Sequence, residues 1–162
     1  MESARIVIVG AGICGAATAY ALAMAGETDV LVLEAEGAFN RHSSGRSASY
    51  FVPVYESALF SRLAREGEAF LAAPPEGFAE HPLIDRRGAV VVHSEHDIRI
   101  HERELATARE LGVPVEVVSP TQVRELVPVA RTEGIARAAW YPGSGAIDAE
   151  ALSMGYIRAR SE

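Results

Sequence analysis

The sequence contains a single cysteine, Cys14, among its 162 residues, so no disulfide can form within the chain. No apolar run approaches the roughly 20 residues that a membrane-spanning helix needs. No cluster of histidines or cysteines has the spacing of metal ligands, and we interpret His93, His96 and His101 as a strand end followed by a solvated helix face. These absences argue against a disulfide scaffold, an integral membrane protein and a zinc protein.

Positive charge is also scarce, because 15 lysines and arginines face 22 aspartates and glutamates and the net charge is −7. An acidic chain is unsuited to nucleic acid as its main partner and is repelled by anionic lipid. A predicted strand begins almost at residue 1, without the pattern of a signal peptide. The simplest expectation is a cytoplasmic protein, and the composition, 49% hydrophobic and 23% charged, is that of a globular domain.

The sequence does contain a glycine turn in the setting of a dinucleotide-binding unit. Residues 6–9 form an apolar run that predicts a buried parallel strand. Gly10, Gly12 and Gly15 follow in the spacing G-x-G-x-x-G. In that order they allow a tight turn, the approach of a pyrophosphate to bare backbone, and close packing of helix on strand. Helical spacing of apolar residues then continues to about Gly26.

A second apolar run, residues 30–33, ends on Glu34. Glu34 lies about 20 residues past the glycines, where a carboxylate can accept hydrogen bonds from ribose hydroxyls. The intervening helix would offer free N–H groups to phosphates. We interpret Cys14, inside the turn, as a small packing residue rather than a redox thiol. The pattern predicts a βαβ nucleotide site without choosing between FAD and NAD; the alternative is a plain βαβ unit with an incidental Glu34.

The segment after Glu34 is too long for a routine loop, and such segments are often functional. Its centre reads His42-Ser-Ser-Gly-Arg-Ser-Ala48. Several hydroxyls, one guanidinium and flexible backbone would suit a phosphate, a ribityl chain or the polar edge of a flavin. The alternative is a solvated loop.

These motifs, with residues 74–83 and 145–148, resemble the D-amino-acid oxidase-like family of FAD-dependent oxidoreductases, and within it most closely the D-arginine dehydrogenase-type enzymes. The resemblance covers essentially the whole chain and implies FAD as the cofactor. The residues expected to contact FAD are Gly10, Gly12, Ile13, Cys14, Gly15, Glu34, Ala35, His42, Ser43, Ser44, Arg46, Ser47 and Ala48.

The expected fold class is α/β: an incomplete Rossmann-like FAD-binding domain with an inserted α+β substrate domain. We expect the FAD-binding domain over residues 1–80, the start of the substrate domain over 81–143, and a return to the FAD-binding domain over 144–162. Family members are roughly twice this length, as two domains require. The chain is therefore interpreted as an N-terminal part that is inactive by itself.

Local patterns predict the remaining elements. Helices are expected over residues 57–72, from the capping pattern Ser94-x-x-Asp97 to Gly112, from Ser119-Pro120-x-Gln122 to Pro128, and after a cap at Asp148. Strand material is expected over residues 83–92 around a turn at 85–88, and over 115–118 and 135–140.

The resemblance implies oxidation of the C–N bond of D-amino acids or related amines by hydride transfer to flavin, with the protein supplying binding and orientation. Tyr55 and Tyr50 are the candidate catalytic residues, since a phenol could hold a substrate amine or carboxylate; alternatively both are partly buried aromatics. The substrate, the electron acceptor and the choice between oxidase and dehydrogenase stay open. Two alternatives are an NAD-linked oxidoreductase and a non-catalytic nucleotide-binding fragment.

The side-chain preference of the substrate is expected to differ from that of the arginine-type enzymes. A pocket for a guanidinium needs a carboxylate. The strand after His81-Pro82 offers Ala89 at the expected contact, and Asp85 can be neutralised by Arg86 or Arg87. We therefore predict a neutral side chain.

Overall fold

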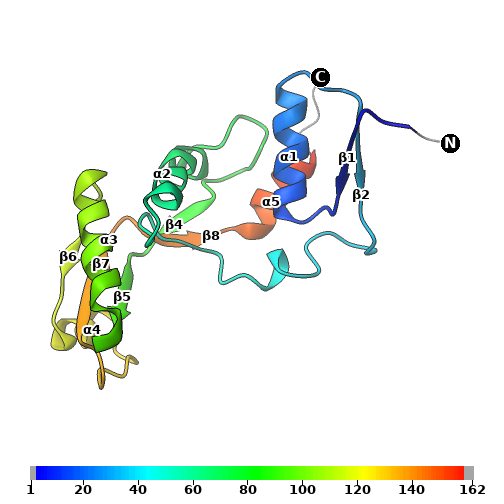
Figure 1. Cartoon of the computed structure of the whole chain (residues 1–162). Coiled ribbons are helices and arrows are strands. Elements are labelled where there is room, and N and C mark those ends of the chain that lie inside the picture. Colours follow the sequence, from blue (N-terminus) through cyan, green and yellow to red (C-terminus); the bar gives the residue numbers. More distant parts are fainter. Residues whose placement is uncertain (1–2, 159–162) are drawn as a thin grey trace. The chain divides into compact units, whose positions relative to one another are not determined.

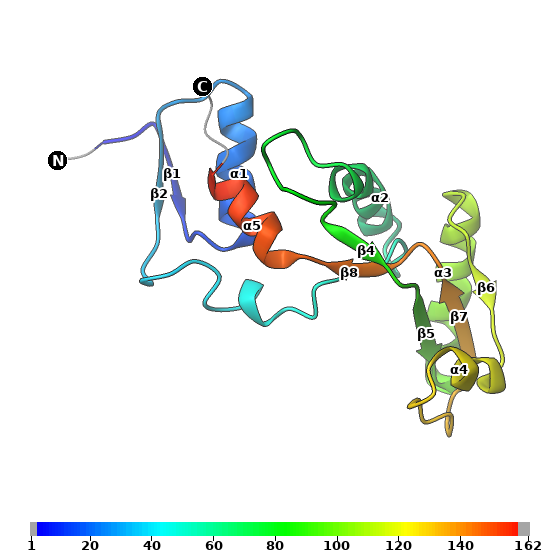
Figure 2. The ribbon, with the colours of Figure 1, turned by 180° about the vertical axis from the view of Figure 1, so that it is seen from behind.

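The computed structural model describes residues 3–158 and divides them into two compact units. The described part of the first unit comprises residues 3–49, 73–83 and 147–158, and the second unit comprises residues 50–72 and 84–146. Figures 1 and 2 show the chain from two opposite sides. Among the described residues, no helix is both long and apolar enough to span a membrane.

The first unit is built on the predicted βαβ motif. Strand β1 (Ile6–Val9) pairs in parallel with β2 (Val30–Leu33), and α1 (Ile13–Met24) connects them. Gly26, with a φ of +84°, follows the C-cap residue of α1. The strands and helix predicted from hydrophobic periodicity are thereby confirmed.

Helix α5 (Ala149–Arg158) packs against α1 in this unit, as Figure 2 shows. Tyr20, Phe78 and Tyr156 form an aromatic cluster there, with ring centroids 5.1–5.5 Å apart. A Cβ at Gly155 would overlap the Phe78 ring, so glycine permits this packing. The predicted cap is present, because the Asp148 carboxylate accepts a hydrogen bond from the Ala151 N–H at 2.8 Å.

The second unit contains the strands β5 (Ala89–His93), β6 (Glu116–Val117) and β7 (Arg137–Tyr141) and the helices α2 (Ala58–Ala72), α3 (Ile98–Glu110) and α4 (Pro120–Leu126). Its central sheet is antiparallel and has the strand order β5-β7-β6. The core beside helix α3 contains Val54, Ala108, Val113, Ala139 and Tyr141.

A second small sheet, in the order β3-β8-β4, contains two strands that the sequence did not predict. They are β3 (Tyr50–Phe51) and β8 (Gly145–Ile147), which are too short to carry a periodic pattern. Strand β4 (Ile84–Arg86) includes Asp85 and Arg86, so the turn before β5 is shorter than predicted.

The two predicted capping boxes have different outcomes. Ser119 and Gln122 form the reciprocal pair at the start of α4, as predicted. At the other site the Ser94 hydroxyl donates to the Asp97 carboxylate at 2.6 Å, and a short 3₁₀ turn, η2 (Glu95–Asp97), precedes α3. The capping prediction for Ser94 is therefore wrong, because the two side chains satisfy each other instead of the helix backbone.

Residues 50–72 belong to the second compact unit, although the substrate domain was expected to begin only at residue 81. The boundary expected at residue 80 lies close to the change of unit after Leu83. The assignment of the units to cofactor and substrate stays a prediction.

The interpretation of the histidines as a solvated face is wrong for His93 and His101, which are both buried. His93 lies on the face of β5 turned toward α3, and its Nε2 is 3.3 Å from the Glu104 carboxylate. The two imidazole rings are 5.2 Å apart. His96 is exposed, as expected. No group of residues within 3–158 is arranged to hold a metal ion.

The buried histidine pair predicts acid sensitivity. Burial, and then the positive charges of His93 and Arg137, lower the pKa of His101 below its usual 6.5. As the pH falls below 6.5 the unfolded chain binds this proton first, so stability decreases until the folded pKa is passed. Burial raises the pKa of Glu104, which acts in the opposite direction.

We expect His101→Gln to lose less thermal stability than the unchanged protein between about pH 7.5 and 5.5, because glutamine stays neutral. The measurement is the unfolding midpoint at each pH. The exposed His96→Gln is the matched control and should behave like the unchanged protein. An equal loss in all three proteins would contradict the prediction.

Candidate functional site

The glycine turn brings the end of β1 against the start of α1. Gly10 has a φ of +95°, which favours glycine. A Cβ at Gly15 would overlap the Gly10 carbonyl, so only glycine allows this approach of helix to strand. A Cβ at Gly12 would lie 3.3 Å from the Ser44 hydroxyl. The turn thus leaves its backbone N–H groups close to an oxygen acceptor on another segment.

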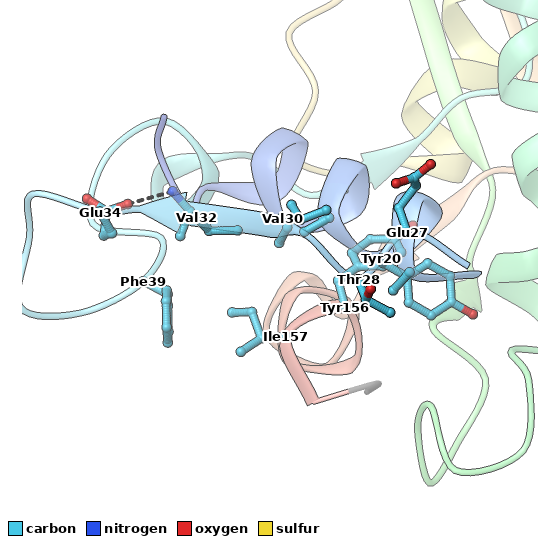
Figure 3. A pocket seen from close by; sticks show the side chains of 13 residues that line it. Tyr20, Glu27, Thr28, Val30, Val32, Glu34, Phe39, Tyr156 and Ile157 are labelled. Carbon is cyan, nitrogen blue, oxygen red and sulfur yellow. Dashed lines mark hydrogen bonds between the residues drawn. The ribbon is translucent and has the colours of Figure 1, made fainter. Parts of the chain in front are cut away.

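Glu34 accepts a hydrogen bond from the first of these N–H groups. The Ala11 N–H donates to Glu34 Oε2 at 2.8 Å, shown as a dashed line in Figure 3, and the Glu36 N–H donates to Oε1 at 2.9 Å. These hydrogen bonds, that from Glu36 first, lower the pKa of Glu34. The carboxylate is therefore ionised at neutral pH and fixed at the end of β2.

Ser44 is the acceptor for a second N–H group, at the start of α1. Its hydroxyl accepts a hydrogen bond at 3.0 Å from the N–H of Ile13, the first residue of α1. Ser44 begins a 3₁₀ turn, η1 (Ser44–Arg46), in the middle of the predicted loop. The structure therefore brings Gly12, Ile13 and Ser44 together, although 31 residues separate the hydrogen-bonded pair.

The remaining predicted cofactor residues of this unit have exposed side chains: Cys14, Ala35, His42, Ser43, Arg46, Ser47 and Ala48. His42 Nε2 lies 2.7 Å from the Glu36 carboxylate. Cys14 is exposed on the first turn of α1, so its expected packing role is wrong. These side chains stay available to a ligand, and the structure does not draw them into one cluster.

Sequence reasoning missed three residues of this region. Ala11 contributes its N–H, which no side-chain motif reveals. The backbone N–H of Glu36 donates to Glu34, and the Glu36 carboxylate accepts from His42 Nε2. Asn40 has a φ of +59°, and its carbonyl lies where a Cβ at Gly45 would be. Asparagine is several-fold enriched in that left-handed conformation, which was the available signal.

A pocket of about 670 Å³ opens on the side of β2 that carries α1 (Figure 3). Val30 and Val32 of β2, Tyr20 of α1, and Tyr156 and Ile157 of α5 supply most of its labelled lining. Glu34 belongs to this lining as well as to the glycine turn. The pocket is mainly apolar. An anion is therefore suited to the backbone N–H groups of the glycine turn rather than to the pocket.

The turn fits the phosphates of a dinucleotide. The N–H groups of Ala11 and Ile13 already point at oxygen acceptors, and pyrophosphate oxygens are acceptors of the same kind. The start of α1 adds a partial positive charge. The ionised Glu34 is an acceptor for ribose hydroxyls. The residues present are thus suited to FAD as well as to NAD.

The two candidate tyrosines belong to the second unit and differ in their contacts. The Tyr50 hydroxyl donates to the Gly88 carbonyl at 2.5 Å. The Tyr55 side chain is 42% exposed and lines an open pocket with Glu56, Phe60 and Arg103. The backbone of Tyr55 is fixed by two hydrogen bonds with the buried Ser61 hydroxyl. Tyr55 is therefore the phenol more available to a ligand.

Comparison with known proteins gives relatives of two kinds. The sequence is 31% identical over 173 aligned residues to FAD-dependent oxidoreductase domain-containing protein 1 of Mus musculus, with 97% of this chain covering 35% of that protein. It is 29% identical over 147 residues to the 4-methylaminobutanoate oxidase (formaldehyde-forming) of Paenarthrobacter nicotinovorans, with 89% of this chain covering 18% of that protein. The chain thus spans about a third or less of these relatives.

The fold is also that of a solved enzyme. The crystal structure of L-proline dehydrogenase from P. horikoshii superimposes with a TM-score of 0.76 at 21% identity, over 96% of this chain and 41% of that one. At this identity the likeness shows the fold alone, and it confirms the α/β, Rossmann-like fold class.

The family model for FAD-dependent oxidoreductases matches residues 5–162, which is nearly the whole chain. This match favours FAD over the NAD-linked alternative and confirms the cofactor that the resemblance implied. The chain therefore belongs to the family of FAD-dependent oxidoreductases.

Proposed function

We propose that this chain supplies the FAD-binding turn and part of the substrate-binding region of a flavoenzyme that oxidises the C–N bond of an amine or a D-amino acid. The observation that carries the proposal is the pair of N–H groups at Ala11 and Ile13, which are held toward oxygen acceptors at the start of α1. The family match makes FAD the dinucleotide to which they belong.

FAD, when bound, supplies the acceptor for a hydride from the carbon that carries the amine. The chain's own residues bind and orient. The glycine turn donates to phosphate, Glu34 accepts from ribose, and the exposed Arg46 and Ser47 are available to the rest of the cofactor. The Tyr55 hydroxyl is proposed to hold the substrate amine or carboxylate.

The amine class is supported by one relative, whose name describes it as an oxidase of 4-methylaminobutanoate, an N-methyl amine. The narrower class of D-amino acids rests on the motifs of the loop from His42 to Ala48. The same reasoning assigns cofactor binding to the first unit and substrate binding to the second.

The charges around Ala89 support a neutral substrate side chain. The Asp85 carboxylate is paired with Arg87 at 2.6 Å, as expected. Arg86 pairs with Glu68 at 2.8 Å. The carboxylates in these contacts, Asp85 and Glu68, are thus each paired with an arginine. Neither is free to pair with a cationic substrate.

The first test is the presence and use of flavin. The complete protein should purify yellow, release flavin on denaturation, and lose flavin absorbance when a suitable amine is added without oxygen. A colourless protein that cannot be reconstituted with FAD would contradict the proposal. If the protein binds FAD but no amine reduces the flavin, the cofactor assignment stands and the proposed reaction is rejected.

The second test concerns side-chain preference. We expect kcat/KM to be at least about tenfold higher for D-leucine or D-methionine than for D-arginine, since each methylene in an apolar pocket contributes about 1 kcal/mol or more and an unpaired guanidinium is unfavourable there. In Ala89→Glu the difference in kcat/KM between the neutral substrates and D-arginine should become smaller. Ala89→Gln, whose side chain is similar in size but uncharged, is the control. A tenfold preference of the unchanged enzyme for D-arginine would show that another carboxylate serves the pocket.

A further inference from the structure

An exposed aromatic side chain lies at the end of the apolar pocket where Glu34 is found. Phe39 belongs to the loop after β2 and is 46% exposed. It lines the pocket of about 670 Å³ together with Glu34 and Ala11, and Figure 3 shows Phe39 and Glu34 at the same end. A second pocket that Phe39 lines, with Ser44 and Ala149, does not include Glu34. The aromatic ring and the carboxylate therefore share one cavity, which lies within the first unit.

This end of the cavity adjoins the glycine turn. Ala11 is buried, lines the cavity, and donates its N–H to Glu34 Oε2 at 2.8 Å. The Glu36 N–H occupies one site on the other carboxylate oxygen. An ionised carboxylate has about four lone-pair sites, so Glu34 keeps acceptor capacity for ribose hydroxyls. An adenosine with its diphosphate at the turn and its ribose at Glu34 would have its base at this end of the cavity.

The lining beside Glu34 is apolar. Val32 and Glu34 are two positions apart, so strand alternation places them on the same face, and both line the cavity. Ile157 of α5 adds a second aliphatic side chain. The charged pair of Glu36 and His42, whose carboxylate and Nε2 are 2.7 Å apart, is not part of the lining. A neutral, flat base is suited to these surroundings, as phosphate is suited to the turn.

We propose that Phe39 is a further cofactor-binding residue, which stacks on the adenine of FAD while Val32 and Ile157 border the same base. Every base has a π-face, so stacking on an aromatic side chain holds it without reading its edge. The volume of the cavity is in the range of small-molecule sites. The inference rests on the proposed function for the cofactor, and it does not depend on which amine is oxidised.

The affinity of the complete apoprotein for ADP and for FAD tests the stacking contact. We expect Phe39→Ala to bind both ligands roughly fivefold to a hundredfold more weakly, as for the loss of one stacked base. Phe39→Tyr keeps an aromatic ring and should bind them as the unchanged protein does. The measurement is isothermal titration calorimetry of each variant with each ligand.

Leu59→Ala is the control, because Leu59 is also an exposed apolar residue but lies on α2 in the second unit. It should not change the affinity for ADP. Equal affinity for ADP in Phe39→Ala and the unchanged protein would overturn the proposal, as would a loss of the same size in Phe39→Tyr. If the unchanged protein binds neither ligand, the cofactor assignment fails too. If it binds both but no amine reduces the flavin, only the proposed reaction fails, and the ADP comparison still decides the role of Phe39.

A second readout detects the base beside the ring directly. With 4-fluorophenylalanine incorporated, the ¹⁹F resonance of Phe39 is assigned by its absence in Phe39→Leu. ADP should shift this resonance, because the ring current of a stacked purine changes the field at the fluorine. Inorganic pyrophosphate, which has no base, should leave the resonance in place. An unmoved resonance with ADP bound, or an equal shift with pyrophosphate, would overturn the contact.

Discussion

The hydrogen-bonding demand of the N–H groups in the glycine turn and at the start of α1 is the constraint on which the cofactor region depends. Ile13, the first residue of α1, has no acceptor for its N–H within its own helix, and Ala11 precedes the helix. Here Glu34 and Ser44, which lie 23 and 31 residues further along the chain, accept from Ala11 and Ile13. Two separate segments, the end of β2 and the loop after it, are thereby drawn to the glycine turn. In the proposed function, the start of α1 is also where the phosphates of the dinucleotide would lie.

The second unit obeys a different constraint, which is the fixing of the β4–β5 turn. Ser144, Tyr50 and Trp140 contact the backbone of Gly88 from separate strands or turns. Because glycine leaves no side chain of its own there, its neighbours set the position of the strand that follows. The phenol of Tyr55, by contrast, is exposed.

The sequence predicted what local chemistry controls. Hydrophobic periodicity and the glycine spacing were sufficient for β1, α1 and β2, and the Ser119–Gln122 box marked the start of α4. The sequence did not predict the features that depend on contacts between residues far apart in the chain. Strand β3 exists only because Tyr50 and Phe51 meet β8, and His93 and His101 are buried because β5 and α3 face each other. Periodicity cannot reveal the bond between Tyr50 and Gly88 either, since 38 positions separate them.

The affinity of the complete apoprotein for FAD, compared between the unchanged chain and Glu34→Gln, tests the central claim most directly. The variant keeps the shape of Glu34 but replaces one carboxylate oxygen by an amide donor, so it cannot accept from both Ala11 and Glu36 and loses its charge-assisted bonds. Such bonds contribute about 1.5–3 kcal/mol, and a fluorescence titration should show FAD binding weakened roughly tenfold to a hundredfold. Glu36→Gln, which alters the neighbouring carboxylate, should bind FAD as the unchanged protein does. Equal affinity in Glu34→Gln would contradict the account and leave Glu34 as a strand end without a ligand.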